Sequence, residues 1–444
     1  MLLLPVPYRD NVRFPLVVLL VGIACRPAGS NISTVSPAED STWEQHDQAS
    51  DSALAARDYP AYLHHLRALE APLSGHPGVV YGIARAHALL GSGDSALVWL
   101  GRYASMDLVR DIARDSAFTA LRGTPGFERV AARIAANGSP IGHCDTVLVL
   151  SDSTLVIEDV ARDPRSGTWY LSSVHQRRVL AVARDGTESD LVPAAGSGLL
   201  TPFAIAIDTA RNLLWVTSAG TPEGVGIAKE DLGRTAVLGF SIPSGRLVSA
   251  FELPRDSTPR VLADIALMDN GELIVSDSRG GGVYQLRPGA GLTRLVAPGT
   301  FPSPQGPAGI SGTHAVLIAD YVRGIARVDR LTGAVRWLLH PADLALNGID
   351  GMRLEGHTLI AVQNGVRPNR VVRLTLDGHF ERILRWETLQ AGTPGMAEPT
   401  HGVFVDSGFV FVANSGWAAL GDDGSFRDGI APERPMLWRI RVTP

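Results

Sequence analysis

The sequence is poor in cysteine and nearly balanced in charge. Two of the 444 residues are cysteines, Cys25 and Cys144, which are too few for a disulfide framework or a cysteine-rich zinc site. The 40 basic and 45 acidic residues give a formal charge of −5, so the charge balance indicates no nucleic-acid partner. Cys144 lies beside His143 at the start of an expected strand, where we expect a buried, inert thiol rather than a nucleophile.

Several catalytic signatures are also missing. The sequence has no phosphate-binding Gly-Lys-Ser/Thr loop, no helical pair of zinc-protease histidines and no Gly-x-Ser-x-Gly nucleophile elbow. These absences argue against P-loop, zincin and α/β-hydrolase chemistry. A Ser/His/Asp arrangement stays open, because such residues need only meet in space.

Long apolar runs are scarce, and the longest lies near the N-terminus. Arg9 and Arg13 precede an uncharged stretch over 14–24, which is too short to span a bilayer but suits the core of a signal peptide. The string Gly22-Ile23-Ala24-Cys25 resembles a bacterial lipobox. We therefore expect a signal peptide over 1–25 and a lipid-anchored envelope protein that faces the periplasm, with Cys25 lipidated. The alternative is ordinary cleavage nearby and release as a periplasmic or secreted protein.

A polar segment and then a helical region follow. Residues 26–41 are rich in Ser, Pro and Ala and predict a flexible linker. Over 42–137 apolar residues recur at helical spacing, as at Tyr62, Leu66 and Leu69. Similar stretches around Ala61 and Ala96 resemble tetratricopeptide repeats, which usually bind a protein partner. The alternative is a plain helical cap that braces the next domain.

The pattern changes to short β-strands after residue 140. One unit occurs six times, and its first strands begin at Glu158, Phe203, Ala263, Ala308, Asp350 and His401. Such spacing is typical of the four-stranded blades of a β-propeller. We therefore predict a mainly β protein, a six-bladed β-propeller over 144–444 preceded by a small α-helical domain. The strands over 145–150 and 436–442 should share a blade and close the ring.

Several strings resemble the gluconolactonase/regucalcin (senescence marker protein) family of six-bladed propellers, with a more distant similarity to paraoxonases and strictosidine synthases. The strings are residues 158–163, 270–278 and 348–352. The resemblance implies an axial divalent metal ion of the calcium or zinc type and hydrolysis of lactones. Glu158 and Asp350 match two ligand positions of that family. Its Asn ligands have no match, because Phe203 and Ala263 stand at their positions and Asp264 comes one residue later.

The first positions of the inner strands should converge on the propeller axis. Glu158, Asp350 and His401 come from blades that are neighbours in a closed ring, so we expect them to face a common point. Two carboxylates and an imidazole suit a divalent cation, with His401 as a ligand or base and Asp350 as a further catalytic group. Phe203, Ala263 and Ala308 would form an apolar wall opposite. The alternative is that axial carboxylates only bind backbone amides, and Asp264 is either such a bracket or an extra ligand.

The turns at the same mouth are rich in arginine. They carry Arg177, Arg279, Arg323 and Arg367, with His175, Tyr321, Asn364 and Trp417 nearby. A ring of guanidinium groups would bind a carboxylate or phosphate of a substrate, although turn arginines also occur for solubility alone. The insertion over 219–235 is either a lid or surface decoration.

These features support two functions. The first is a metal-dependent hydrolase that acts on lactones or esters. The second is a non-catalytic envelope module, in which the propeller binds a ligand or protein and the helices recruit a partner.

Overall fold

A computed structural model describes residues 37–287, 289–406 and 408–442, with side chains from residue 43 onward. The expected signal peptide, the lipidation site Cys25 and most of the expected linker lie outside the described residues. Among the helices that are described, none is long and apolar enough to span a bilayer.

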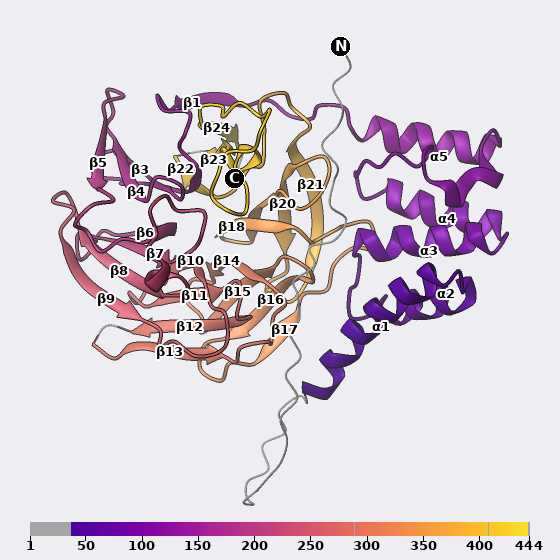
Figure 1. Cartoon of the computed structure of the whole chain (residues 1–444), viewed down its shortest axis with the longest axis horizontal. Coiled ribbons are helices and arrows are strands. Elements are labelled where there is room, and N and C mark those ends of the chain that lie inside the picture. Colours follow the sequence, from indigo (N-terminus) through magenta and orange to yellow (C-terminus); the bar gives the residue numbers. More distant parts are fainter. Residues whose placement is uncertain (1–36, 288, 407, 443–444) are drawn as a thin grey trace, which may run out of the picture. The chain divides into compact units, whose positions relative to one another are not determined.

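The N-terminal part of the described chain is helical, as predicted (Figure 1). Its elements are α1 (Pro37–Ala55), α2 (Tyr59–Ala68), α3 (Pro77–Leu89), α4 (Gly93–Ala104), the 3-10 helix η1 (Ser116–Leu121) and α5 (Pro125–Ala136). Polar side chains cap several of them: Asp58 accepts the Ala61 N–H at the start of α2, and Thr124 accepts the Phe127 N–H at the start of α5. Helix α1 begins inside the segment 26–41 that we expected to be flexible.

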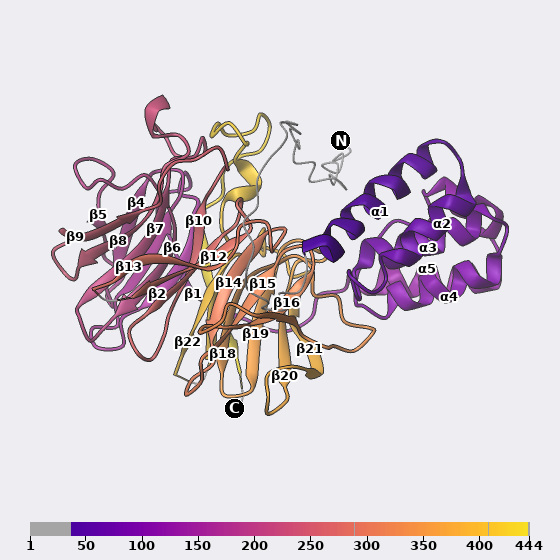
Figure 2. The ribbon, with the colours of Figure 1, turned by 90° about the horizontal axis from the view of Figure 1, so that it is seen from below.

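The rest of the chain forms six four-stranded antiparallel sheets, which confirms the predicted six-bladed propeller (Figures 1 and 2). Blade one holds β2 (Ile157–Arg162), β3 (Trp169–Ser173), β4 (Arg178–Val182) and β5 (Glu188–Val192). Blade two holds β6 (Thr201–Asp208), β7 (Leu213–Ala219), β8 (Thr235–Ser241) and β9 (Leu247–Glu252). Blade three holds β10 (Leu262–Leu267), β11 (Leu273–Asp277), β12 (Gly282–Arg287) and β13 (Gly291–Val296).

The remaining blades continue this order. Blade four holds β14 (Pro304–Gly309), β15 (Ala315–Asp320), β16 (Gly324–Asp329) and β17 (Val335–Trp337). Blade five holds β18 (Ile349–Glu355), β19 (Thr358–Gln363), β20 (Arg370–Leu376) and β21 (Ile383–Ala391). Blade six holds β22 (Gly402–Val405), β23 (Gly408–Asn414) and β24 (Met436–Arg441), with β1 (Asp145–Val149) as its outer strand.

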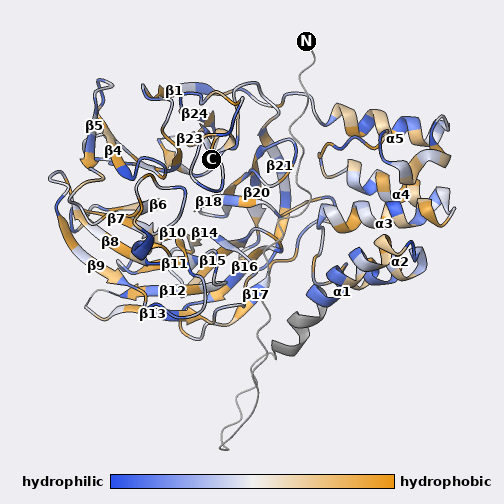
Figure 3. Cartoon of the chain, in the orientation of Figure 1, coloured by the Kyte–Doolittle hydropathy of each residue, from blue (hydrophilic) through white to orange (hydrophobic). Residues whose placement is uncertain are grey.

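The ring closes through the two ends of the propeller, as the sequence predicted. Strand β1 pairs antiparallel with β24, so the first and last strands share blade six. The second strands of the blades, such as β11, β15 and β23, are buried along their whole length. Figure 3 shows these apolar strands, and the large cores lie between adjacent blades. Closure leaves no exposed sheet edge at the seam.

Each inner strand of blades one to five is irregular near its start. In β2 the irregularity falls between Ile157 and Val160, so Glu158 and Asp159 lie opposite a single residue of β3. Blades two and three repeat this arrangement with Phe203 and Ala263 at the position of Glu158. The irregularity therefore sets which side chains reach the axis at the mouth.

The inner strand of blade four differs from the sequence-based prediction. Its irregularity falls between Gln305 and Ala308, which makes Gly306 the counterpart of Glu158. The prediction that Ala308 stands level with Glu158 is wrong, since Ala308 lies two residues further along, level with Val160. The string Ala308-Gly309-Ile310-Ser311 resembles the other strand starts, whereas the true counterpart, Gly306-Pro307-Ala308, does not.

The helical region contacts blade five through a buried arginine. The Arg370 side chain is fully buried, and its Nη1 donates to the Met106 carbonyl at 2.8 Å. Its Nε donates to Gln363 at 2.7 Å, and the Val109 N–H donates to the Arg367 carbonyl at 2.8 Å. These bonds link the segment after α4 to the strands of blade five.

Candidate metal centre on the propeller axis

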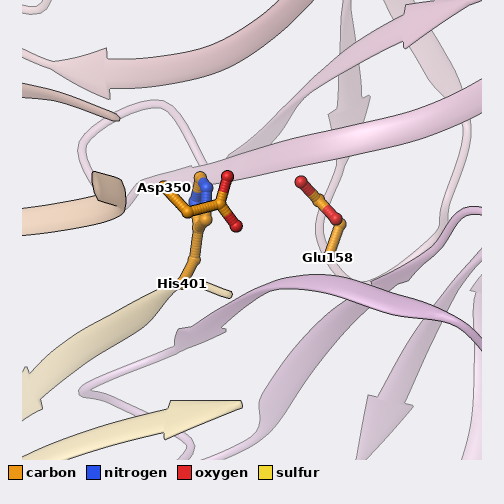
Figure 4. Close-up of side chains that lie close together, drawn as sticks. All are labelled: Glu158, Asp350 and His401. Atoms are coloured by element: carbon orange, nitrogen blue, oxygen red, sulfur yellow. The ribbon is translucent and has the colours of Figure 1, made fainter. Parts of the chain in front are cut away.

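Three side chains from neighbouring blades meet at the axis. Glu158 lies on β2, Asp350 on β18, and His401 directly before β22. One ligand atom from each lies within 4.8 Å of the others, and the side chains point toward one another (Figure 4). The structure thus brings together the three residues that the sequence placed at a common point.

Neighbouring turns hold the two carboxylates in place. The Trp417 Nε1–H donates to Glu158 Oε2 at 2.5 Å. The Asn364 Nδ2–H donates to Asp350 Oδ2 at 2.8 Å, and the Tyr321 hydroxyl donates to Asn364 at 2.9 Å. The sequence had placed these three supporting residues in the mouth turns, but it gave them no role at the centre.

Both carboxyl groups have raised pKa values. Burial raises the pKa of Glu158 to about 8, and the charge of Asp350 adds to the rise. Burial also raises the pKa of Asp350 to about 6, where the charge of His401 and the Asn364 hydrogen bond oppose the rise. Each group nevertheless keeps some solvent exposure. Two neighbouring carboxylates that are costly to ionise together favour the binding of a cation.

His401 lies between two further carboxylates. Its ring is almost completely buried, with Nδ1 3.5 Å from Asp159 Oδ1 and Nε2 3.1 Å from Asp264 Oδ1. Neither ring nitrogen has an aligned hydrogen-bond partner. Burial alone would lower the pKa of His401, but the charges of Asp264 and Asp159 outweigh it and hold that pKa well above its ordinary value.

Asp159 and Asp264 also bind backbone amides. Asp159 accepts the N–H of Val160 at 2.8 Å and that of Ile205, in the next blade, at 3.0 Å. Asp264 accepts the N–H of Gly306, again in the next blade, at 2.9 Å. Burial opposes ionisation of Asp159, yet the charges of His401 and Arg353 keep its pKa below the ordinary range. Asp264 is therefore a bracket between blades that also contacts His401.

Sequence reasoning missed Asp159. It follows Glu158 as Asp264 follows Ala263, and the strand registers place the two aspartates at equivalent positions. The equivalence of Asp159 with Asp264 is the sequence signal that could have identified Asp159. An apolar side is present as expected: Phe203 packs against the buried cluster that contains Ala263 and also against the cluster of Val156, Val174 and Leu420.

The four predicted substrate-binding arginines have different surroundings. Arg177 donates to the carbonyls of Leu199, Val225 and Gly226 at 3.0 to 3.2 Å. Arg323 stacks over Trp337 at 4.2 Å, and Arg367 donates to the carbonyls of Asn364 and Val366 at 3.4 Å. Arg279 is exposed. Their role in binding a substrate anion stays a prediction.

The insertion over 219–235 is packed against its neighbours. It contains the short 3-10 helix η2 (Lys229–Asp231), and the Val225 N–H donates to the His175 carbonyl at 2.8 Å. A Cβ on Gly424, in the loop of blade six, would lie 2.2 Å from the Pro222 carbonyl oxygen, so the two loops touch. Figure 2 shows both loops rising above the ring on the same side. Whether the insertion opens as a lid stays a prediction.

Cys144 is partly buried, rather than fully buried as we expected. Its thiol donates to the Gln390 side chain at 3.1 Å, and burial together with the charge of Asp145 raises its pKa to about 12. A thiol that stays protonated at neutral pH is a poor nucleophile.

The donor set fits a divalent cation. Carboxylate oxygens and an imidazole nitrogen are ligands for such ions, and the two nitrogens of His401 have no aligned partner within the protein. The centre lies next to the axis, among strands from three different blades. Glu158, Asp350 and His401 would therefore hold the ion.

Comparisons with known proteins concern the propeller. No protein-family model matches the chain, and no curated protein matches its sequence. A gluconolactonase of Xanthomonas campestris is 16% identical over 69% of this chain and 92% of that chain, with a TM-score of 0.46. The calcium-binding regucalcin of Agrobacterium tumefaciens is 16% identical over 67% and 97% of the two chains, with a TM-score of 0.46. A virginiamycin B lyase of Staphylococcus aureus is 12% identical over 68% and 99%, with a TM-score of 0.44.

The six-bladed propeller of this chain is similar in fold to these solved structures. At these identities the likeness concerns the fold and carries no information about the reaction.

Proposed function

We propose that this protein is a metal-dependent hydrolase of lactones or related esters, with its cation at the axial centre. The observation that supports it best is the meeting of Glu158, Asp350 and His401 within 4.8 Å, from three separate blades. The raised pKa values of the two carboxylates point the same way, because close carboxylates are costly to ionise unless a cation sits between them.

The cation would polarise the substrate carbonyl and lower the pKa of the attacking water. Glu158 and Asp350 would hold it through their oxygens, and Trp417 and Asn364 would keep those side chains oriented. In the metal-free protein burial raises the pKa of Asp350 to about 6, so the cation would compete with a proton for this carboxylate near neutral pH. The mouth arginines would receive the carboxylate of the product, a role that their position in the turns suggests.

The first experiment measures metal content and hydrolysis together. The full chain is purified, stripped with EDTA and titrated with Ca²⁺ or Zn²⁺, and activity is assayed on γ- and δ-lactones. We expect one cation per chain, and both its binding and hydrolysis should be lost in Glu158→Gln and Asp350→Asn. Glu272→Gln is the control, since that carboxylate binds Arg287 and Arg330 far along the chain from the centre. A protein that binds no divalent cation would contradict the proposal.

One observation favours a second function, a non-catalytic binding propeller. Both nitrogens of His401 face aspartates, and Arg353 Nη2 lies 3.4 Å from Asp159. A chain of charges from blades one, three, five and six is also what an axial structural clamp requires. In that case Glu158→Gln and Asp350→Asn would leave ligand binding intact, whereas changes at the mouth arginines would weaken it.

We further propose that the protein is exported and anchored by lipid at Cys25, and that the helical region recruits a protein partner. The apolar stretch over 14–24 and the lipobox-like string before Cys25 support the first proposal. The helical architecture of α1 to α5 supports the second.

A further inference from the structure

The propeller contains a cavity on the other side of the axial centre. Its volume is about 670 Å³, and the inner strands of all six blades line it, through residues that include Val160, Ile205, Ile265, Ala308, Arg353 and Val403. It opens among the turns between first and second strands, which is the end opposite to the mouth turns. Glu158, Asp350 and His401 do not line it.

The wall of this cavity is mainly apolar. Aliphatic and alanine side chains from β2, β6, β10, β14 and β18 line it along the inner strands, and polar residues such as Asn270 and Thr313 line it in the turns between first and second strands. A cavity of this volume is large enough for a small organic molecule, whose body would lie against the apolar side chains of the inner strands. The occupant should therefore have an apolar body.

Two guanidinium groups supply positive charge to the same cavity. Arg353 lines the cavity, and its guanidinium donates to the Met352 carbonyl at 3.0 Å and to Asp159 Oδ1 at 3.4 Å. Arg162 lies 3.8 Å from Asp406, whose side chain is 86% exposed and neutralises it weakly. A third lining arginine, Arg330, is already paired with Glu272 at 2.8 Å. Among the lining residues Asp269 is acidic.

We propose that the cavity binds a small monocarboxylate with an apolar body, oriented with its carboxylate at Arg353. The apolar wall would take the body of the ligand out of water, and the guanidinium would form charge-assisted hydrogen bonds to the carboxylate. Glu158, Asp350 and His401 do not line this cavity, although Arg353 also contacts Asp159 beside the centre, and the proposal does not depend on the hydrolase function.

Calorimetric titration with octanoate tests the proposal, with 1-octanol as the neutral partner of the same chain length. EDTA-treated full-length protein is used, so the result is independent of the metal centre. We expect octanoate to bind about tenfold more tightly than 1-octanol, a preference that one charge-assisted hydrogen bond accounts for. Arg353→Met should remove the preference, and Arg385→Met, on the exposed face of β21, should keep it.

A second variant covers the case in which Arg353→Met fails to fold. Ala206 lines the cavity, and Ala206→Phe would fill part of it without removing a charge. We expect this variant to weaken octanoate binding by about tenfold or more, the order expected when apolar contacts of a bound chain are lost. Equal affinity for octanoate and octanol would overturn the proposal. So would octanoate binding that is unchanged in Ala206→Phe, since the ligand would then sit elsewhere.

Discussion

The charge of Glu158 should cost the metal-free protein stability at alkaline pH. Burial and the charge of Asp350 raise its pKa from the ordinary 4.5 to about 8. A carboxyl whose pKa is raised on folding binds its proton more tightly in the folded chain. Its stabilising contribution is therefore present below about pH 4.5 and is lost as the pH rises through about 8. We expect metal-free Glu158→Gln to be more stable than the wild type at pH 9 and equal to it at pH 5.

The size of this effect follows from the shift. A rise of the Glu158 pKa from 4.5 to about 8 corresponds to about 4 kcal/mol or more in the free energy of unfolding. The partial exposure of Glu158 and the neighbouring charges reduce the part of this energy that one substitution recovers. We expect a gain of about 2 kcal/mol at pH 9, which is a few degrees in the midpoint of thermal unfolding. Gln keeps an acceptor for the Trp417 N–H, so the substitution removes the charge and little else.

Thermal unfolding in EDTA, followed by circular dichroism at both pH values, measures the effect. Glu272→Gln is the matched control, because its carboxylate is paired with Arg287 and Arg330 and its pKa is lowered. That substitution should destabilise the protein at pH 9. A divalent cation at a hundredfold its Kd should add about 2.7 kcal/mol to the wild type and nothing to Glu158→Gln. If Glu158→Gln is instead less stable than the wild type in EDTA at pH 9, the reasoning is refuted.

Three further predictions concern other residues. Nitrogen-15 NMR of the metal-free protein should show the His401 ring still protonated at pH 8, because its pKa is raised, and a neutral ring there would contradict the charge assignment. Arg370→Met should lower the free energy of unfolding in urea by about 3 kcal/mol, since it leaves the Met106 carbonyl without its partner, whereas exposed Arg385→Met should change it by less than about 0.5 kcal/mol. Cys25→Ser should abolish incorporation of labelled palmitate in cells, and unchanged labelling would reject the lipid anchor.

The blades could be predicted because each repeats the same sequence pattern. Apolar strands alternate with Gly, Asp and Asn turns, and an unpaired strand at each end of the array demands closure. The helical region could likewise be predicted, from the helical spacing of its apolar residues. The start of α1 at Pro37 was missed, because a stretch of Pro, Ser and Ala before an acidic pair has the composition of a linker and also that of a helix N-terminus.

The centre was predicted less completely than the fold. The prediction assigned one axial residue to each inner strand, which identifies Glu158, Asp350 and His401. A bulge, however, places two consecutive residues near the axis. For that reason the prediction omitted Asp159. It also took Ala308 as the counterpart of Glu158, although Gly306, two residues earlier, holds that position. The partners of the mouth arginines are carbonyl groups of distant loops, and no side-chain pattern in the sequence reports on them.

The charge balance at the axis bears on the role of His401. Glu158, Asp159, Asp264 and Asp350 supply four carboxylates, and His401 and Arg353 supply two cationic groups. With every group ionised the cluster carries two negative charges in excess, which two protons or one divalent cation would neutralise. When no metal is bound, the pKa of about 8 keeps a proton on Glu158 at neutral pH, whereas Asp350, with a pKa of about 6, takes up the second proton in mildly acidic solution. A cation that replaces those protons balances the cluster while His401 keeps its own proton between its two aspartates. On this argument Glu158 and Asp350 supply the charge that binds the metal, and His401 becomes its third ligand only when its ring gives up the proton that the two aspartates favour.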